Sequence, residues 1–283
     1  MPGAGLRVAI QGERGAFSHQ AALQVCGEGI TLVPRPTFDA LVASVLDGEA
    51  DRGILPIENS LVGSIHENYD RLRHVALSIV GETQVRVDHC LIGRPGATLQ
   101  SIRRVASHPV ALAQCTRFFA ERPDLEPVPA YDTAGSVLDL LRKDGPVTSA
   151  AIASRLAAEI HGGAILLEKI QDDPENHTRF VVLSKVATFP TGPSKTSVVF
   201  ALKNAPGALH RALTPFASRG VDLAKIESRP LKGRPWEYVF YIDVLGAPGA
   251  GVDAALEELR ALSEEFRVLG HYPPGTTMLT EGG

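Results

Sequence analysis

Residues 54–60 have the sequence ILPIENS, an apolar run that passes without a gap into polar residues. The apolar part predicts a short buried strand, and Pro56 marks its end because proline has no amide hydrogen to donate within a sheet. Glu58, Asn59 and Ser60 follow the strand directly. This stretch therefore predicts polar side chains at the carboxyl end of a buried strand.

The segments before this strand predict further strands and helices. Residues 6–10 form a short apolar run, and apolar positions with helical spacing begin at Phe17. Thr37 can cap a second helix, because its side-chain oxygen can accept a hydrogen bond from a free amide of the first turn. Apolar residues recur on one face of that helix, and Gly48 is placed to end it.

The same alternation continues after residue 60. The pattern predicts a strand near Val105, a helix that Pro109 opens, apolar residues at 128 and 130, and a helix over 135–141. Strands that alternate with helices predict the α/β class with a parallel or mixed sheet. In such sheets, ligands bind beyond the carboxyl ends of the strands. The polar residues predicted there are Glu58, Asn59, Ser107, Asp132 and Thr133.

A change of composition at residues 184–195, rich in Pro, Gly and Ser, predicts a linker. After it, the pattern predicts a strand at 196–202, a helix with Leu209, Leu213 and Phe216 on one face, two more strands, a helix over 252–266 and a last strand near Val268. This order fits a small ferredoxin-like module.

The composition excludes several classes of protein. The chain has 283 residues, which suggests two domains, and 21% of them are charged, as in ordinary globular proteins. The formal net charge is -4 and no cluster of cations stands out, so we expect no nucleic-acid partner. No apolar stretch is long enough for a membrane span and no secretory signal is recognisable, so we expect a cytoplasmic protein.

Several motifs that would indicate a cofactor or a metal are incomplete. Gly12 and Gly15 follow the first strand, but their spacing matches neither nucleotide-binding fingerprint. The nine histidines have no partners at recognised metal-ligand spacing, and the three cysteines predict free buried thiols. We therefore expect neither a cofactor nor a metal.

Read together, these segments resemble the prephenate dehydratase family, and the second module resembles the ACT domain of those enzymes. The stretches that carry the resemblance are 12–18, 56–60, 107–114, 132–134, 176–180, 207–210 and 227–230. Three positions depart from the family pattern: Glu13, Val110 and Asp222. A carboxylate at 222 would attract the ammonium of a bound amino acid and repel its carboxylate.

The resemblance implies a two-lobed, periplasmic-binding-protein-like catalytic domain followed by a ferredoxin-like βαββαβ ACT domain. The expected boundaries are a catalytic domain at 1–185, a linker at 186–195, an ACT domain at 196–275 and a tail at 276–283. Within the catalytic domain we expect lobe one at about 1–84 and 170–185, and lobe two at about 85–169.

The resemblance also implies an activity: prephenate loses carbon dioxide and its ring hydroxyl to give phenylpyruvate, on the route to phenylalanine. Thr178 is expected to donate to the leaving hydroxyl. Two roles stay open for Arg179, which can bind a substrate carboxylate or pair with Glu58 or Asp172. The residues expected to hold or orient the substrate are Asn59, Gln114, Ser107, Glu58, Ser60, Thr133 and Phe180.

The ACT resemblance implies feedback inhibition by L-phenylalanine, bound between two such domains of a homodimer or homotetramer. Free amides at the start of the helix after Gly207 can cradle the effector's carboxylate. The expected effector residues are Asn204, Gly207, Ala208, Leu209, Glu227, Ser228 and Arg229. A simple turn and a solvated ion pair are the alternative readings of these two segments.

Two alternative functions stay open. Arogenate differs from prephenate only in an amino group in place of the keto oxygen, so an arogenate dehydratase fits the same residues. A non-catalytic amino-acid sensor is the alternative from another class, although residues 176–180 favour the enzyme. Because the first strand begins near Leu6, we expect no fused chorismate mutase domain.

Overall fold

A computed structural model describes residues 5–142, 147–231, 234, 236–247 and 249–275, so the predicted tail at 276–283 lies outside the described residues. The chain divides into two compact units. The first is formed mainly by Met1–Asn68 and Thr83–Phe180, and the second joins Tyr69–Glu82 to Val181–Thr277. Within the described residues, no helix is long and apolar enough to cross a membrane.

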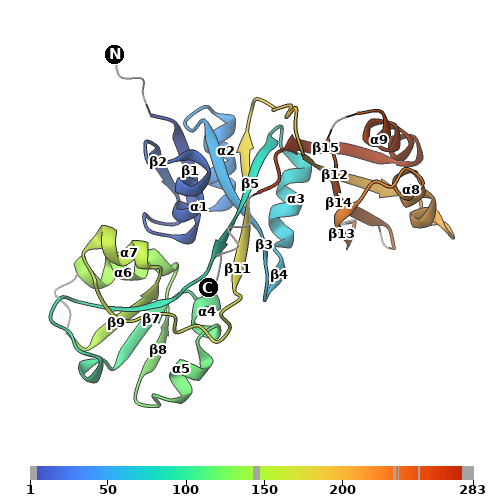
Figure 1. Cartoon of the computed structure of the whole chain (residues 1–283). Coiled ribbons are helices and arrows are strands. Elements are labelled where there is room, and N and C mark those ends of the chain that lie inside the picture. The colour runs from blue at the N-terminus through green and yellow to red at the C-terminus, as the bar shows by residue number, and fades with distance from the viewer. Residues whose placement is uncertain (1–4, 143–146, 232–233, 235, 248, 276–283) are drawn as a thin grey trace, which may run out of the picture. The chain divides into compact units, whose positions relative to one another are not determined.

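The first sheet has the strand order β2-β1-β3-β11-β5, and β4 pairs with β3 (Figure 1). Both β2 and β3 run parallel to β1, whose central residues are fully buried, as expected for a strand of a covered parallel sheet. The strands are β1 (Arg7–Gln11), β2 (Thr31–Arg35), β3 (Arg52–Asn59), β4 (Gly63–Ser64), β5 (Ser78–Arg86) and β11 (His177–Ser184). The helices between them are α1 (Phe17–Cys26), α2 (Phe38–Leu46) and α3 (His66–His74).

Strand β3 corrects one expectation, because it continues through Pro56 to Asn59. Proline removes only a donor, and its carbonyl still accepts a hydrogen bond of 2.7 Å from Nδ2 of Asn68. Beyond it, Glu58 and Asn59 pair with β4. The cap of α2 is confirmed, since the Thr37 side chain accepts from the amide of Ala40 over 3.1 Å.

The second sheet has the order β10-β6-β9-β7-β8. Strands β8 and β9 are parallel to β7, whereas β6 is antiparallel to its two neighbours β9 and β10, so the sheet is mixed and the predicted α/β class is confirmed. Its strands are β6 (Cys90–Gly93), β7 (Arg104–Ser107), β8 (Glu126–Pro129), β9 (Ser149–Ala153) and β10 (Ala164–Leu167). Its helices are α4 (Pro109–Ala113), α5 (Thr116–Ala120), α6 (Thr133–Arg142) and α7 (Arg155–His161).

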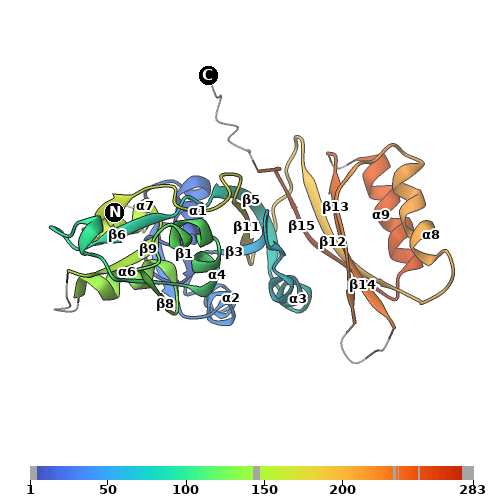
Figure 2. The same cartoon turned by 90° about the horizontal axis from the view of Figure 1, so that it is seen from below.

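The C-terminal module follows the predicted βαββαβ order and forms an antiparallel sheet, β13-β14-β12-β15. Figure 2 shows α8 and α9 side by side on one face of this sheet. Its elements are β12 (Lys195–Leu202), α8 (Ala208–Ala217), β13 (Leu223–Pro230), β14 (Tyr238–Leu245), α9 (Ala250–Leu262) and β15 (Glu265–Tyr272).

Two details of this module differ from the sequence-based expectation. Helix α8 buries Ala212, Pro215 and Phe216, whereas Leu209 is 37% exposed, so the predicted apolar face is rotated. Small residues made the true buried face inconspicuous. The second helix ends at Leu262, and Phe266 belongs to β15.

The three thiols are free. Cys90 and Cys115 are buried, as expected, and Cys26 is half-buried. Burial raises the pKa of the Cys90 thiol to about 11 and that of Cys115 to about 12, so both stay protonated and unreactive at neutral pH.

Candidate active site

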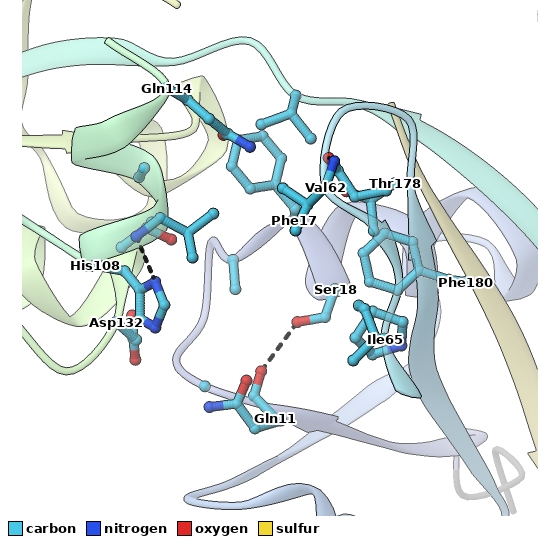
Figure 3. A pocket seen from close by; sticks show the side chains of 18 of the residues that line it. Gln11, Phe17, Ser18, Val62, Ile65, His108, Gln114, Asp132, Thr178 and Phe180 are labelled. Atoms are coloured by element: carbon cyan, nitrogen blue, oxygen red, sulfur yellow. Dashed lines mark hydrogen bonds between the residues drawn. The ribbon is translucent and has the colours of Figure 1, made fainter. Parts of the chain in front are cut away.

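A cavity of about 500 Å³ lies within the first unit. Figure 3 shows its wall from close by. Its polar lining residues are Gln11, Ser18, Asn59, His89, His108, Gln114, Tyr131, Asp132, Thr133 and Thr178, and its apolar wall includes Phe17, Phe38, Val62, Ile65, Val87, Val110 and Phe180. The cavity thus combines a mostly apolar wall with a few polar groups, as small-molecule sites do.

Strand topology explains where the polar groups lie. Gln11 and Asn59 stand at the carboxyl ends of β1 and β3, and His108 follows β7 directly. Asp132 lies in the short connection from β8 to α6. Because the carboxyl ends of parallel strands meet at one edge of a sheet, both sheets present their polar loops to the same cavity.

Asn59 and Thr178 form the best-connected polar group of the wall. Nδ2 of Asn59 donates to Oγ1 of Thr178 over 3.0 Å and to Oδ1 of the fully buried Asn176 over 2.8 Å. Its Oδ1 accepts from the amides of Leu61 and Val62, both over 3.1 Å. The Thr178 oxygen therefore already serves as an acceptor, which leaves the hydroxyl hydrogen available to a ligand.

A histidine that sequence reasoning did not assign holds Gln114. Nε2 of His89 lies 3.0 Å from Oε1 of Gln114, and since an amide oxygen only accepts, the ring nitrogen must donate. His89 is 1% exposed, and its ring packs edge-on against Phe17 with centroids 5.6 Å apart. Burial lowers the pKa of His89, so the ring is neutral, and the Gln114 amide hydrogens are left for a ligand.

The N-terminus of α1 supplies positive potential at the cavity without a cation. Helix α1 begins at Phe17, its N-cap residue Ala16 gives no side-chain cap, and its first turn holds no acidic residue. Ala16, Phe17 and Ser18 all line the cavity. Uncapped amides at a helix start bind carboxylates well, so this end of the cavity suits an anionic substrate.

The charge of the wall is unusual for a site that would bind a dianion. Among the described residues that line the cavity there is no lysine or arginine, and Asp132 is the one carboxylate. Oδ1 of Asp132 accepts from the amide of Gly135 over 2.6 Å and so caps α6. Within the described residues, no group of three or more His, Cys, Asp or Glu side chains is arranged to hold a metal.

The comparison with known protein families agrees with this architecture. Residues 8–188 match the model of the family described as Prephenate dehydratase, and residues 196–264 match the ACT domain. The chain belongs to the prephenate dehydratase family.

Members of the family that resemble the chain come from plants and bacteria. Arogenate dehydratase/prephenate dehydratase 2 of Arabidopsis thaliana is 42% identical, covering 98% of this chain and 75% of the plant protein. A bifunctional chorismate mutase/prephenate dehydratase of Stutzerimonas stutzeri is 36% identical, covering 95% of this chain and 73% of that protein. The prephenate dehydratase of Arthrobacter aurescens, solved with L-Phe, is 38% identical with a TM-score of 0.86, covering 95% and 90% of the two chains.

In this member of the prephenate dehydratase family, five of the residues expected to act on the substrate line the cavity: Asn59, Gln114, Thr133, Thr178 and Phe180. Ser107 does not line it. This side chain is fully buried, and its hydroxyl donates to the carbonyl of Ile152 over 2.7 Å, which ties β7 to β9. A residue pattern cannot tell which way such a hydroxyl faces.

Three other expected residues also lie outside the lining. Nη1 of Arg179 is 3.7 Å from Oε2 of Glu58, and the Arg179 side chain is only 11% exposed. Of the two roles considered for Arg179, this contact corresponds to the structural ion pair with Glu58. The Ser60 hydroxyl donates to the carbonyl of Glu175 over 2.8 Å and accepts from the amide of His177 over 2.9 Å. Ser60 thus holds the loop that leads into Thr178.

The residues expected to bind the effector lie in the second unit. Gly207 has φ +74° as the residue before α8 and no side chain caps that helix. Oε2 of Glu227 pairs with Lys225 over 3.3 Å and Nη1 of Arg229 pairs with Asp70 over 3.0 Å. Asn204, Leu209 and Ser228 are exposed, and Ala208 is half-buried.

A second cavity, of about 540 Å³, adjoins α8 and the end of α9. Ala208 lines this cavity, whereas Glu227 and Arg229 do not. Among the described residues of one chain, the two segments expected to bind the effector, 207–209 and 227–229, therefore do not line this cavity together.

Proposed function

We propose that this chain catalyses the decarboxylating dehydration of prephenate to phenylpyruvate and the same reaction of its amino analogue arogenate. The observation that carries the proposal is the contact between Asn59 and Thr178 at the cavity wall, which presents a hydroxyl hydrogen beside an apolar cavity. Membership of the prephenate dehydratase family supports the reaction class.

In the reaction, the ring loses its hydroxyl and its carboxylate together, and aromatisation provides the driving force. Thr178 donates its hydroxyl hydrogen bond to the departing ring oxygen. A threonine hydroxyl is too weak an acid to release its proton outright, so the proton passes to the departing oxygen as the carbon–oxygen bond breaks, and the Thr178 oxygen regains a proton from solvent after water and carbon dioxide have left. The hydrogen bond that Asn59 donates to Thr178 stabilises the negative charge that develops on the Thr178 oxygen.

Neutral donors suit the carboxylate that leaves as carbon dioxide. A cation paired with that group would stabilise the ground state and oppose its conversion into a neutral molecule. The Gln114 amide, held by His89, can orient the carboxylate without pairing with it as an ion. The uncapped start of α1 would receive the other carboxylate.

Arogenate is the second candidate substrate. The carboxylate of Asp132 in a wall without lysine or arginine favours a substrate that carries an ammonium group. The names of the plant relatives, which include arogenate dehydratase, point in the same direction.

Feedback inhibition by L-phenylalanine is part of the proposal, with the effector bound between ACT modules of a homodimer or homotetramer. The ACT domain at 196–264 supports it, as does the relative from Arthrobacter aurescens that was solved with L-Phe. Inhibition requires that phenylalanine binds the less active arrangement more tightly.

The test is turnover by the purified chain with prephenate and then with arogenate, each with and without phenylalanine and without added metal. We expect aromatic product from at least one substrate and less of it when phenylalanine is present. A folded chain that binds phenylalanine but turns over neither substrate would contradict the enzyme and favour the amino-acid sensor.

A further inference from the structure

We propose that Asp132 is a specificity-determining residue that makes arogenate the preferred substrate. This inference rests on the proposed dehydratase function and deepens it, because it names which of two closely similar substrates the cavity selects. The two molecules differ at one position of the side chain, where prephenate has a keto oxygen and arogenate an ammonium group.

The first step concerns where that position lies in the cavity. In both substrates, the ring hydroxyl and the side chain occupy opposite ends of the ring. If Thr178 receives the hydroxyl, the side chain must point to the far wall. Figure 3 shows Thr178 and Asp132 on opposite sides of the cavity, with the ring of His108 beside Asp132, so Asp132 belongs to the wall toward which the side chain would point.

The second step concerns which oxygen of Asp132 is available. Oδ1 is occupied by the amide of Gly135 over 2.6 Å, whereas Oδ2 has no donor among the residues that the structure describes. A methyl group placed on Gly12 would lie 3.6 Å from Oδ2, and one on Gly135 would lie 3.0 Å from it. Since both neighbours are glycines, no side chain from either position covers this oxygen.

The third step concerns charge. Prephenate would bring two carboxylates into a described lining that offers no lysine or arginine and already contains Asp132. The nearby Arg179 is paired with Glu58 outside the lining. Arogenate brings its own cation, which Oδ2 can accept as a charge-assisted hydrogen bond. At the same position prephenate presents a keto oxygen with a partial negative charge, which the carboxylate repels, so attraction and repulsion act in one direction.

The capping role of Asp132 can be separated from the role in specificity. Asparagine and serine cap helices about as well as aspartate, and neither carries a charge. Asp132→Asn and Asp132→Ser therefore retain the start of α6 and remove only the carboxylate. Asp47→Asn, at the exposed end of α2 and outside the cavity, is the matched control for loss of one negative charge.

The experiment measures kcat/KM for arogenate and for prephenate with the 283-residue chain and these three variants, at one pH and ionic strength. We expect the parent chain and Asp47→Asn to prefer arogenate. In both Asp132 variants, we expect the ratio of the two kcat/KM values to shift toward prephenate by roughly 10-fold or more, the scale of a close charge contact.

The outcomes separate the two proposals. Turnover of neither substrate by the folded parent chain would overturn the dehydratase function itself. A parent chain that prefers prephenate would leave the function standing and overturn the role of Asp132. An equal loss for both substrates in the Asp132 variants would also overturn it, because a purely structural cap affects the two reactions alike.

Discussion

The side-chain amide of Asn59 donates to the hydroxyl oxygen of Thr178 over 3.0 Å, although 119 residues separate them in the chain. The same amide reaches the carbonyl of His177 over 3.1 Å, so it fixes both the backbone and the side chain at the start of β11. Thr178 is held as an acceptor and has one hydrogen left to donate. The chemistry of the site depends on this pairing.

Removal of the Thr178 hydroxyl tests the pairing most directly. We expect Thr178→Ala to lower kcat by roughly 100-fold or more with little change in KM, the scale of a lost proton-transfer contact. Steady-state kinetics with the preferred substrate measure both constants. Thr178→Ser keeps the hydroxyl and serves as the control, for which most of the activity should remain. An unchanged kcat in Thr178→Ala would remove Thr178 from the mechanism.

Asn59→Ala should act on the same step through its partner. The substitution leaves the buried Asn176 oxygen without its donor, so we expect a loss of about 1–3 kcal/mol in the free energy of unfolding as well as a lower kcat. Because Asn59 works through Thr178, the double variant with Thr178→Ala should be little slower than Thr178→Ala alone. Effects on kcat that multiply independently would argue against the coupling. Urea unfolding measures the stability of the parent, the two single variants and the double variant, and steady-state kinetics measure kcat for the same double-mutant cycle.

Gly15 lies in the loop between β1 and α1, with φ +92°. A Cβ there would stand 2.5 Å from the Cα of Ala157, so Gly15→Ala should lower the free energy of unfolding by about 2–5 kcal/mol. Gly251→Ala, at an open position of α9, is the matched control and should stabilise by roughly 0.5–1 kcal/mol. Equal melting temperatures for the two variants would show that the loop has no close contact at Gly15.

The neutral state of His89 predicts a pH dependence of stability. Burial lowers the pKa of His89 in the folded chain, so the unfolded chain takes up the proton first as pH falls. This contribution to stability is complete above about pH 6.5 and is lost as pH falls below that value, by at most about 1.4 kcal/mol per pH unit.

His89→Gln isolates this effect. Burial also lowers the pKa of His19 and His271, which push stability in the same direction, so the comparison between parent and variant matters more than either curve. The fall in melting temperature between pH 7 and pH 5 should be smaller in His89→Gln. An identical fall in both proteins would mean that His89 is already charged in the folded chain.

Regulation is better tested by substitution than by deletion of the ACT module. In the second unit, Nζ of Lys195 pairs with Oε1 of Glu82 over 2.6 Å, and these side chains are 12% and 6% exposed. Arg73 pairs with Glu265 in the same unit. A chain that ends near residue 184 would leave Glu82 and Arg73 without these partners, so lost activity could not be assigned to regulation.

Gly207→Ala should weaken inhibition by phenylalanine. A side chain at φ +74° is strained by about 1–2 kcal/mol, and its Cβ would lie 3.1 Å from Nη1 of Arg211. We expect the phenylalanine concentration for half-inhibition to rise about tenfold, while kcat without phenylalanine stays close to the parent value. Gly192→Ala, in open space between β11 and β12, should change neither quantity. Unchanged inhibition in Gly207→Ala would exclude this turn from the effector site.

Local patterns predicted the elements well because they depend on neighbours along the chain. The cap at Thr37 and the βαββαβ order of the second module follow from apolar spacing and turn chemistry. The failures occur where burial depends on distant partners. The face of α8 could not be predicted from its leucines, since alanine and proline are buried beside the expected phenylalanine.

The sequence by itself determined the class, the order of strands and helices and the segments that carry polar groups, because propensity and periodicity act over a few residues. Only the tertiary structure decided which of those groups face the cavity. Ser107 donates to a carbonyl of the neighbouring strand, and Arg179 pairs with Glu58. His89 donates to Gln114, and Asp132 lines the cavity. Each of these choices depends on contacts between segments far apart in the chain, where packing and hydrogen-bond satisfaction prevail over local preference.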